Sequence, residues 1–226
     1  MSAMPDTLLL AIVLIPCLIV AIVFHEVAHG WSALALGDPT AKEQRRLSLN
    51  PIRHIDPVGT VILPGFLALV GAPVFGWAKP VPVNASRLRN PRFGMMAVAA
   101  AGPATNFALA LVGAAALGVA SATGLAANAL VSQGIFTFIL INVFIAVFNL
   151  LPIPPFDGSH IVEGALPRRM AAAYEKLRPF GMLVFFGLIA LAWALPDADI
   201  MGRAIMPPVQ WLLRHYLAFA ALFTGG

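Results

Sequence analysis

The sequence has 226 residues, of which 60% are hydrophobic and 11% are charged, and its formal net charge is +4. A soluble domain carries about 25% charged residues, so this composition excludes an ordinary soluble domain and predicts a polytopic helical membrane protein. The positive charge fits Lys and Arg in cytoplasmic loops, and we expect no nucleic-acid partner because no basic, aromatic module is present. The single cysteine, Cys17, excludes a disulfide framework and a cysteine zinc site within one chain.

Six apolar segments follow one another along the chain, and several reach the ~20 residues that a spanning helix needs. They are Thr7–Leu36, Val58–Phe75, Phe93–Ala122, Leu130–Leu151, Phe180–Leu195 and Ala204–Phe223. We therefore predict an all-α, polytopic membrane fold of five to six apolar segments. It forms a single domain over residues 1–226, with a core at about 7–160 and C-terminal helices at 161–226. The N-terminal stretch MSAMPDT has no Lys or Arg, so we expect the first helix to be retained rather than cleaved as a signal peptide. The last segment could span the bilayer or lie in its interface.

Three connectors carry most of the positive charge. Gly37–Asp56, Trp77–Arg92 and Asp157–Pro179 hold four Lys or Arg each, which is 12 of the 14 in the chain. The positive-inside rule puts all three on the cytoplasmic side, which is impossible if Val58–Phe75 crosses the bilayer completely. That segment contains two prolines and two glycines, which make a poor continuous helix. We predict that it is re-entrant and shielded by protein, with an ordinary kinked span as the alternative. The prolines that follow predict a short extended stretch near Trp77–Val83, which could be a plain loop or present an edge to an extended substrate.

The first apolar segment ends in three ionisable residues within the motif HEVAH, residues 25–29. On a helix, positions i and i+4 share a face, so His25 and His29 can ligate one metal ion. Glu26 lies beside them, where a carboxylate can take the proton of a water activated by zinc. Ionisable groups inside a membrane are costly and usually functional. The motif therefore predicts a zinc site rather than an ordinary polar helix face.

A catalytic zinc site needs a third protein ligand and an open position. Of the ten Asp and Glu residues, only Glu26 and Asp157 belong to apolar stretches or their immediate ends. Asp157 follows a run with three prolines, where a helix must break. Taken alone, Asp157 could be the third ligand or only the N-cap of the helix that follows.

Helix lengths favour the ligand. The 18 residues from Thr7 to His25 and the 16 from Gln133 to Asn149 cover similar distances of about 24–27 Å at 1.5 Å per residue. Two parallel helices of this length, with one span between them, bring Asp157 to the depth of the histidines. The same arrangement requires that Val58–Phe75 does not cross the bilayer.

These motifs resemble those of the site-2 protease family of intramembrane zinc metalloproteases, peptidase family M50, in its short bacterial form without PDZ or CBS domains. The matching elements are HEVAH, the pattern N-x-x-P-x-x-x-x-D-G that ends at Gly158, and G-P-x-x-N at residues 102–106. The resemblance covers roughly residues 18–160. It implies His25, His29 and Asp157 as the ligands of one Zn²⁺ per chain, with Glu26 as the base and Asn149 near the scissile peptide.

The two asparagines of these motifs are expected to act differently. Asn149 could donate a hydrogen bond to a developing oxyanion beside the metal. Asn106 is expected to be a helix–helix hydrogen-bond partner that supports the site rather than a catalytic group.

The expected activity is hydrolysis of a peptide bond within or beside a transmembrane helix of a membrane-protein substrate, as in regulated intramembrane proteolysis. We expect a multi-pass protein of the cell (inner or plasma) membrane, embedded in the lipid bilayer, with the active site towards the cytoplasmic side. The alternatives are a membrane zinc hydrolase of a lipid or small amide, and a non-enzymatic metal or ion carrier. The sequence does not define the substrate, the need for a prior cut, or the oligomeric state.

Overall fold

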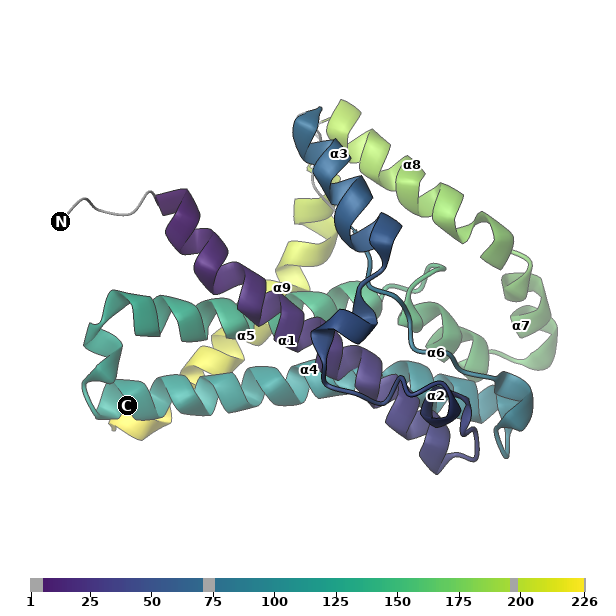
Figure 1. Cartoon of the computed structure of the whole chain (residues 1–226), viewed down its shortest axis with the longest axis horizontal. Coiled ribbons are helices and arrows are strands. Elements are labelled where there is room, and N and C mark those ends of the chain that lie inside the picture. Colours follow the sequence, from purple (N-terminus) through teal and green to yellow (C-terminus); the bar gives the residue numbers. More distant parts are fainter. Residues whose placement is uncertain (1–5, 71–75, 196–198, 226) are drawn as a thin grey trace.

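Helices make up all the regular secondary structure in the part of the chain that the structure describes, residues 6–70, 76–195 and 199–225 of a computed structural model (Figure 1). The all-α prediction is therefore confirmed for these residues. The α-helices are α1 (Asp6–Ala35), α2 (Thr40–Glu43), α3 (Leu63–Leu69), α4 (Pro91–Ala122), α5 (Ala129–Asn149), α6 (Asp157–Ala165), α7 (Arg168–Glu175), α8 (Gly181–Ala194) and α9 (Ile200–Ala221). The shorter helical turns are η1 (Pro51–His54), the π-helix η2 (Pro57–Ile62), η3 (Ala85–Arg87), η4 (Leu125–Ala127), η5 (Arg178–Phe180) and η7 (Leu222–Thr224).

Three helices in the described ranges are long and apolar enough to cross a membrane: α4, α5 and the Ile12–Ala35 part of α1. They contain 32, 21 and 24 residues, or about 48, 32 and 36 Å at 1.5 Å per residue, against a hydrocarbon core of about 30 Å. Three of the predicted apolar segments thus form helices of spanning length. The other three contain α3, α8 and α9, which do not meet the same criteria.

The three long helices alternate in direction, as side-chain contacts along them show. The thiol of Cys17 in α1 lies 3.9 Å from the Gly134 carbonyl of α5, and four residues later the Ala21 carbonyl accepts from Asn106, which also bonds Asn142 of α5. Contacts therefore advance in the same sense along α1 and α5, and these helices are parallel, as predicted. Helix α4 runs the opposite way and contacts both of them (Figure 1).

Two asparagines begin the long helices of the hairpin α4–α5. The side chain of Asn90 accepts from the N–H of Phe93, and Pro91 occupies the first helical position, where its missing N–H costs nothing. Asn128 accepts from the N–H groups of Leu130 and Val131 at the start of α5. Such caps satisfy donors that the helix itself leaves free.

The apolar core lies where α4, α5 and α9 meet. Its buried members are Ala110, Ala114, Ile139, Val143, Ile205 and Val209. Gly113 lets α5 approach α4, because a Cβ there would lie 2.9 Å from Ile139 and 3.1 Å from Phe138. The hydroxyl of Tyr216 donates to the Phe107 carbonyl. With Ile205 and Val209 in the core, the last predicted apolar segment therefore packs on α4 and α5.

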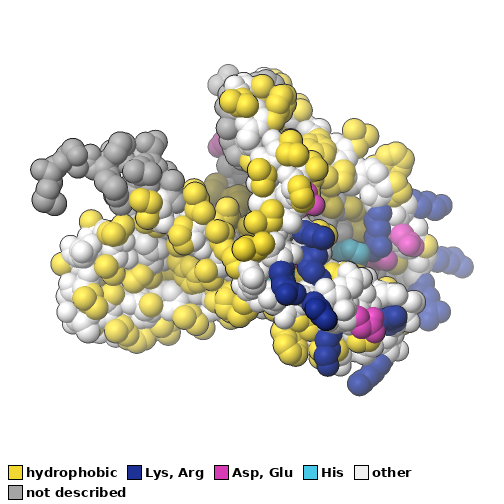
Figure 2. Space-filling view, in the orientation of Figure 1, with side chains coloured by type: hydrophobic (Ala, Val, Ile, Leu, Met, Phe, Trp, Pro, Cys, Tyr) yellow, Lys and Arg dark blue, Asp and Glu magenta, His cyan; other side chains and the backbone are white. Residues whose placement is uncertain are grey.

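The three basic connectors meet one another at one end of the molecule. The Arg46 guanidinium of the first donates to the Lys79 carbonyl of the second at 2.8 Å, and the Arg92 guanidinium of the second donates to carbonyls of the third at Gly164 and Leu166. Figure 2 shows Lys and Arg gathered at this end, over α2, α6 and α7, while hydrophobic side chains dominate elsewhere on the visible face. The gathering of the three connectors agrees with the charge-based prediction.

A buried carboxylate fastens the end of α1 to the second connector. Asp38 is fully buried and accepts hydrogen bonds from the Thr40 hydroxyl and from the N–H groups of Thr40 and Asn84. Burial alone would raise the pKa of Asp38, but these hydrogen bonds and the nearby Arg87 hold that pKa below its ordinary value. The ionised form is thus the one that the fold stabilises.

The predicted re-entrant segment Val58–Phe75 contains η2 and α3 but no continuous helix of spanning length in its described part; residues 71–75 lie outside the described residues. On the far side of that gap, the Trp77 N–H donates to the Gly59 carbonyl at 3.1 Å, and the Thr60 hydroxyl donates to the Trp77 carbonyl. Trp77 therefore lies beside Gly59 and Thr60, so the two ends of this segment are close together in space. The stretch Trp77–Val83 that follows is neither helical nor a regular strand.

Candidate metal centre

The two histidines of HEVAH lie one turn apart on α1, as the i, i+4 spacing predicts. Both are buried, with 5% of His25 and 9% of His29 exposed. Their ring centroids are 4.7 Å apart and the rings stand almost perpendicular. Because both residues lie in a regular helix, helical geometry alone sets the positions of their two side chains relative to one another.

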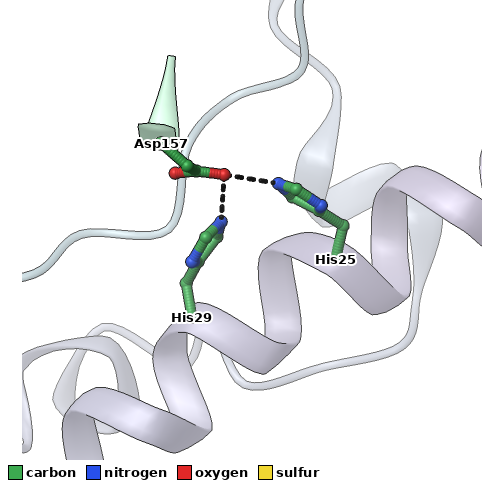
Figure 3. A group of neighbouring side chains, drawn as sticks. All are labelled: His25, His29 and Asp157. Carbon is green, nitrogen blue, oxygen red and sulfur yellow. Dashed lines mark ion pairs between the residues drawn. The ribbon is translucent and has the colours of Figure 1, made fainter. Parts of the chain in front are cut away.

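Asp157 reaches the histidines from the start of α6. Its carboxylate Oδ2 lies 3.1 Å from Nε2 of His25 and 3.4 Å from Nε2 of His29 (Figure 3). The three prolines after α5 end that helix, and Phe156 is the N-cap of α6 without a side-chain cap bond. The alternative interpretation of Asp157 as an N-cap is therefore wrong, because Asp157 is the first helical residue and its carboxylate faces α1.

Hydrogen bonds at the far side of each ring decide which nitrogen faces Asp157. Nδ1 of His29 lies 2.7 Å from the Val98 carbonyl, which can only accept, so this nitrogen carries the proton. Nδ1 of His25 lies 2.6 Å from Oδ1 of Asn106. The amide of Asn106 turns its NH₂ towards the Ala21 carbonyl, so its oxygen is the end that accepts from His25. In the neutral rings, both Nε2 atoms therefore keep free lone pairs.

This donor set fits a metal ion. The three candidate ligand atoms lie within 4.8 Å of one another. Oδ2 of Asp157 is buried and forms no hydrogen bond, although it lies at ion-pair distance from both rings. Because three lone-pair atoms converge on one point, a cation between them would relieve their mutual repulsion. Two imidazoles and one carboxylate, each histidine held by an outer hydrogen bond, are a ligand set and outer shell typical of catalytic zinc.

Gly102 of α4 leaves the space in which the two imidazoles sit. A Cβ at this position would lie 2.5 Å from Nε2 of His29 and 2.6 Å from Cε1 of His25. Real Cβ atoms essentially never approach other atoms so closely. The glycine of the G-P-x-x-N element is therefore required by the site.

Glu26 is half-buried and one of its oxygens is held by the backbone. Oε2 accepts from the Val81 N–H at 2.8 Å. Val81 packs against α1 at Gly30, where a Cβ would lie 2.9 Å from the valine methyl. The Trp77–Val83 stretch thus lies over the HEVAH turn of α1 and contacts the carboxylate directly.

The two asparagines singled out from the sequence lie in different settings. Asn106 is fully buried and contacts His25 directly, in line with the supporting role expected of it. Asn149 is at the end of α5, and its side-chain N–H donates to the Ile145 carbonyl of its own helix. Its assignment as an oxyanion donor stays a prediction.

Sequence reasoning missed three groups that surround the site: the Val81 N–H, the Val98 carbonyl and the side chain of Asn142. The first two are backbone groups, and the contacts of a backbone group cannot be predicted from the type of its residue. Asn142 did carry a signal, because it is an amide inside an otherwise apolar run, where polar side chains usually have a function.

Three apolar helices of spanning length, with a buried His, His, Asp donor set and an adjacent glutamate, define the class of membrane zinc metalloproteases. Comparison with known proteins gives the family. The pattern described as peptidase family M50 matches residues 117–192, which include Asp157 but not the histidine motif. YwhC of Bacillus subtilis (strain 168), named as a candidate zinc metalloprotease, is 40% identical over 179 residues, covering 77% of this chain and 78% of YwhC.

Proteins named Rip2, also candidate zinc metalloproteases, are more distant. The one from Mycolicibacterium smegmatis is 28% identical over 172 residues, and the one from Mycobacterium tuberculosis strain H37Rv is 30% identical over 178 residues. In each case this chain matches 64% of the relative's length. No solved structure is significantly similar to the chain.

The chain belongs to peptidase family M50, the site-2 protease family. It is a zinc metalloprotease with Zn²⁺ as its cofactor, and its apolar helices agree with a location in a membrane.

Proposed function

We propose that the protein cleaves a peptide bond within or beside a transmembrane helix of a membrane-protein substrate. The observation that carries this proposal is the convergence of His25, His29 and Asp157 on one point inside a bundle of spanning-length helices. A hydrolytic centre at that position acts on segments that are themselves in the bilayer. The substrate class is therefore a protein with a helix that can enter the bundle and unwind there.

We assign His25, His29 and Asp157 as the zinc ligands. When bound, zinc acidifies water and polarises a peptide carbonyl. The chain's own contribution is to hold both rings with their Nε2 lone pairs towards the ion, through Asn106 and the Val98 carbonyl. Such outer partners fix ring orientation and typically matter 10–100-fold for metal affinity or activity.

Glu26 is proposed as the general base. It is the neighbour of His25 on α1, so the turn that places the ligand also places the carboxylate. The Val81 N–H engages Oε2, and a carboxylate bound at one oxygen retains acceptor capacity at the other. In this role Glu26 accepts a proton from the attacking water and returns it to the leaving amine.

Asn149 is proposed to help bind the substrate carbonyl. Its amide has two N–H groups, of which one donates to the Ile145 carbonyl. The other can donate to a carbonyl oxygen on which negative charge develops. The residue stands where α5 ends before the proline-rich turn that leads to Asp157, so substrate backbone approaching the ligand would pass close to it.

We further propose that the chain is one multi-pass domain of the cell membrane, with the metal centre towards the cytoplasmic side. The contacts among the three basic connectors support this sidedness, because the positive-inside rule places such loops in the cytoplasm. The hydrogen bond between Trp77 and Gly59 supports a re-entrant Val58–Phe75, since a segment that returns to its starting point does not cross.

The test is Glu26→Gln in the purified protein, with zinc content and cleavage measured on the same sample. A fluorogenic membrane-protein substrate and a lipid substrate are offered in parallel detergent assays. We expect the variant to keep zinc and to lose peptide cleavage, while the wild type leaves the lipid intact. If the variant still cleaved the peptide bond, the assigned base would be wrong. If the wild type hydrolysed the lipid and left the peptide substrate intact, the proposed substrate class would be wrong.

A further inference from the structure

Asn142 is a fully buried amide in the middle of α5, and the chemistry proposed above does not use it. Asn106, its neighbour on α4, is also fully buried. Polar side chains in such positions must find partners, because an unsatisfied amide in an apolar interior costs free energy. The partners of Asn142 lead through Asn106 to the ring of His25.

Two backbone carbonyls fix the direction of every bond in this chain of contacts. Nδ2 of Asn142 donates to the Phe138 carbonyl at 2.9 Å, so the oxygen of Asn142 is the end that faces α4. That oxygen accepts from Nδ2 of Asn106 at 2.9 Å. The same Nδ2 donates its second proton to the Ala21 carbonyl at 3.1 Å. Carbonyls only accept, so neither amide can be turned around without facing oxygen towards oxygen.

The consequence reaches the metal centre. Both protons of the Asn106 amide are committed, so only its oxygen is left for Nδ1 of His25, 2.6 Å away. The ring must then carry its proton on Nδ1 and present an unprotonated Nε2 towards Asp157. Ala21 alone fixes which end of the Asn106 amide faces the ring. The second bond, to Asn142, fixes the plane of the amide and with it the direction of the bond to His25.

We propose that Asn142 is a positioning residue of the zinc centre, which acts through Asn106 to fix the orientation of the His25 ring. The inference rests on the proposed function, which assigns His25 as a ligand. A competing view is that Asn142 only joins α4 to α5, as interhelical amides do in membranes. In that case its loss lowers stability and leaves metal binding alone.

The experiment measures zinc affinity of the full chain in detergent, by competition with a chromophoric chelator, together with the visible spectrum of the Co²⁺-loaded protein. Asn142→Leu and Asn142→Ala remove the acceptor, and two variants guard against one that fails to fold. Asn142→Asp has the shape of asparagine, and in its protonated form it can donate to the Phe138 carbonyl while its other oxygen accepts from Asn106. Val143→Ala is the matched control, because Val143 is a fully buried neighbour that packs in the apolar core instead. Thermal unfolding is recorded for each variant.

We expect Asn142→Leu and Asn142→Ala to bind zinc about 10-fold more weakly, the lower end of the effect of outer-shell residues, and to change the Co²⁺ spectrum. Asn142→Asp should retain the wild-type affinity. Val143→Ala should unfold at lower temperature and retain both the affinity and the spectrum.

Two results overturn the proposal: unchanged affinity and spectrum in the Leu and Ala variants, or an Asp variant as weak as Leu. A His25→Ala variant separates this failure from that of the proposed ligand set. If His25→Ala itself leaves zinc affinity unchanged, the ligand assignment is wrong and the inference falls with it. If His25→Ala abolishes binding while the Asn142 variants bind normally, only the inference is wrong.

Discussion

Replacing Gly102 by alanine is predicted to disable the metal centre through one methyl group. The added Cβ would lie 2.5 Å from Nε2 of His29 and 2.6 Å from Cε1 of His25, while ordinary contacts begin near 3.4 Å. One or both rings must therefore move by about 0.8–0.9 Å, if α4 stays in place. Zinc–nitrogen bonds are 2.0–2.1 Å long, and ligand distances within about 0.2 Å of such values define a competent site. The required shift is about four times that tolerance.

We expect Gly102→Ala to weaken zinc binding by at least about 100-fold, which corresponds to about 2.8 kcal/mol, and to abolish proteolysis. The assay is chelator competition on the detergent-purified protein, with zinc content measured by elemental analysis. Gly134→Ala is the matched control, because nothing lies within 4 Å of a Cβ there. Gly113→Ala is a second control, since it strains packing against Ile139 but does not touch the histidines.

The reasoning predicts a different signature for each variant. Gly113→Ala should unfold at lower temperature with normal zinc affinity, while Gly134→Ala should resemble the wild type in both. Gly102→Ala should lose zinc even if it unfolds at the wild-type temperature in the absence of metal. Wild-type zinc affinity in Gly102→Ala would refute the idea that this glycine makes room for the ligands.

The remaining predictions concern the contact between Val81 and Glu26 and the buried carboxylate of Asp38. Val81→Pro removes the N–H that donates to Glu26 and should lower kcat about 10-fold at unchanged zinc content. Val81→Ala keeps the N–H and should not lower kcat. Equal turnover by both variants would exclude a role for this hydrogen bond. Asp38→Ala should lower the free energy of unfolding by about 2–3 kcal/mol, since it leaves buried donors unpaired. Glu43→Ala, which removes an exposed ion pair with Arg87, should have a much smaller effect. The pKa of Asp38 in the folded protein lies below its ordinary value of about 3.9. The ionised carboxylate therefore stabilises the fold above about pH 3.9, and this contribution is lost as the pH falls further. The free energy of unfolding of Asp38→Ala should then depend less on acid pH than that of the wild type.

The sequence predicted those features that depend on local chemistry. Helical spacing alone places His25 and His29 on one face of α1. The long apolar runs predicted every end of α1, α4 and α5 to within two residues, because a membrane-spanning helix must satisfy its own backbone. Asp157 could be found because acidic residues are so rare in the apolar part of this chain.

Features that depend on backbone groups brought together by the fold could not be predicted. No residue type signals that the N–H of Val81 will meet Glu26, or that the carbonyl of Val98 will hold His29. The need for glycine at position 102 also appears only when α1 is packed against α4. The sequence shows that Asn142 is a polar residue in an apolar helix. It does not show that its side chain bonds to Asn106 rather than to another helix.

The position of Asp157 in the chain has a consequence for how the molecule assembles. The two histidines lie on the first helix, and Asp157 lies 132 residues after His25, beyond the whole α4–α5 hairpin. An ion that binds all three residues therefore links two distant parts of the chain, and its binding free energy adds to the free energy of unfolding because the unfolded chain does not bring the three ligands together. Zinc would thus hold α6 against α1, and removing the ion would break this link. Stripping the metal should loosen the contact between α6 and α1 first, so the ion proposed for catalysis would also help to hold the fold together.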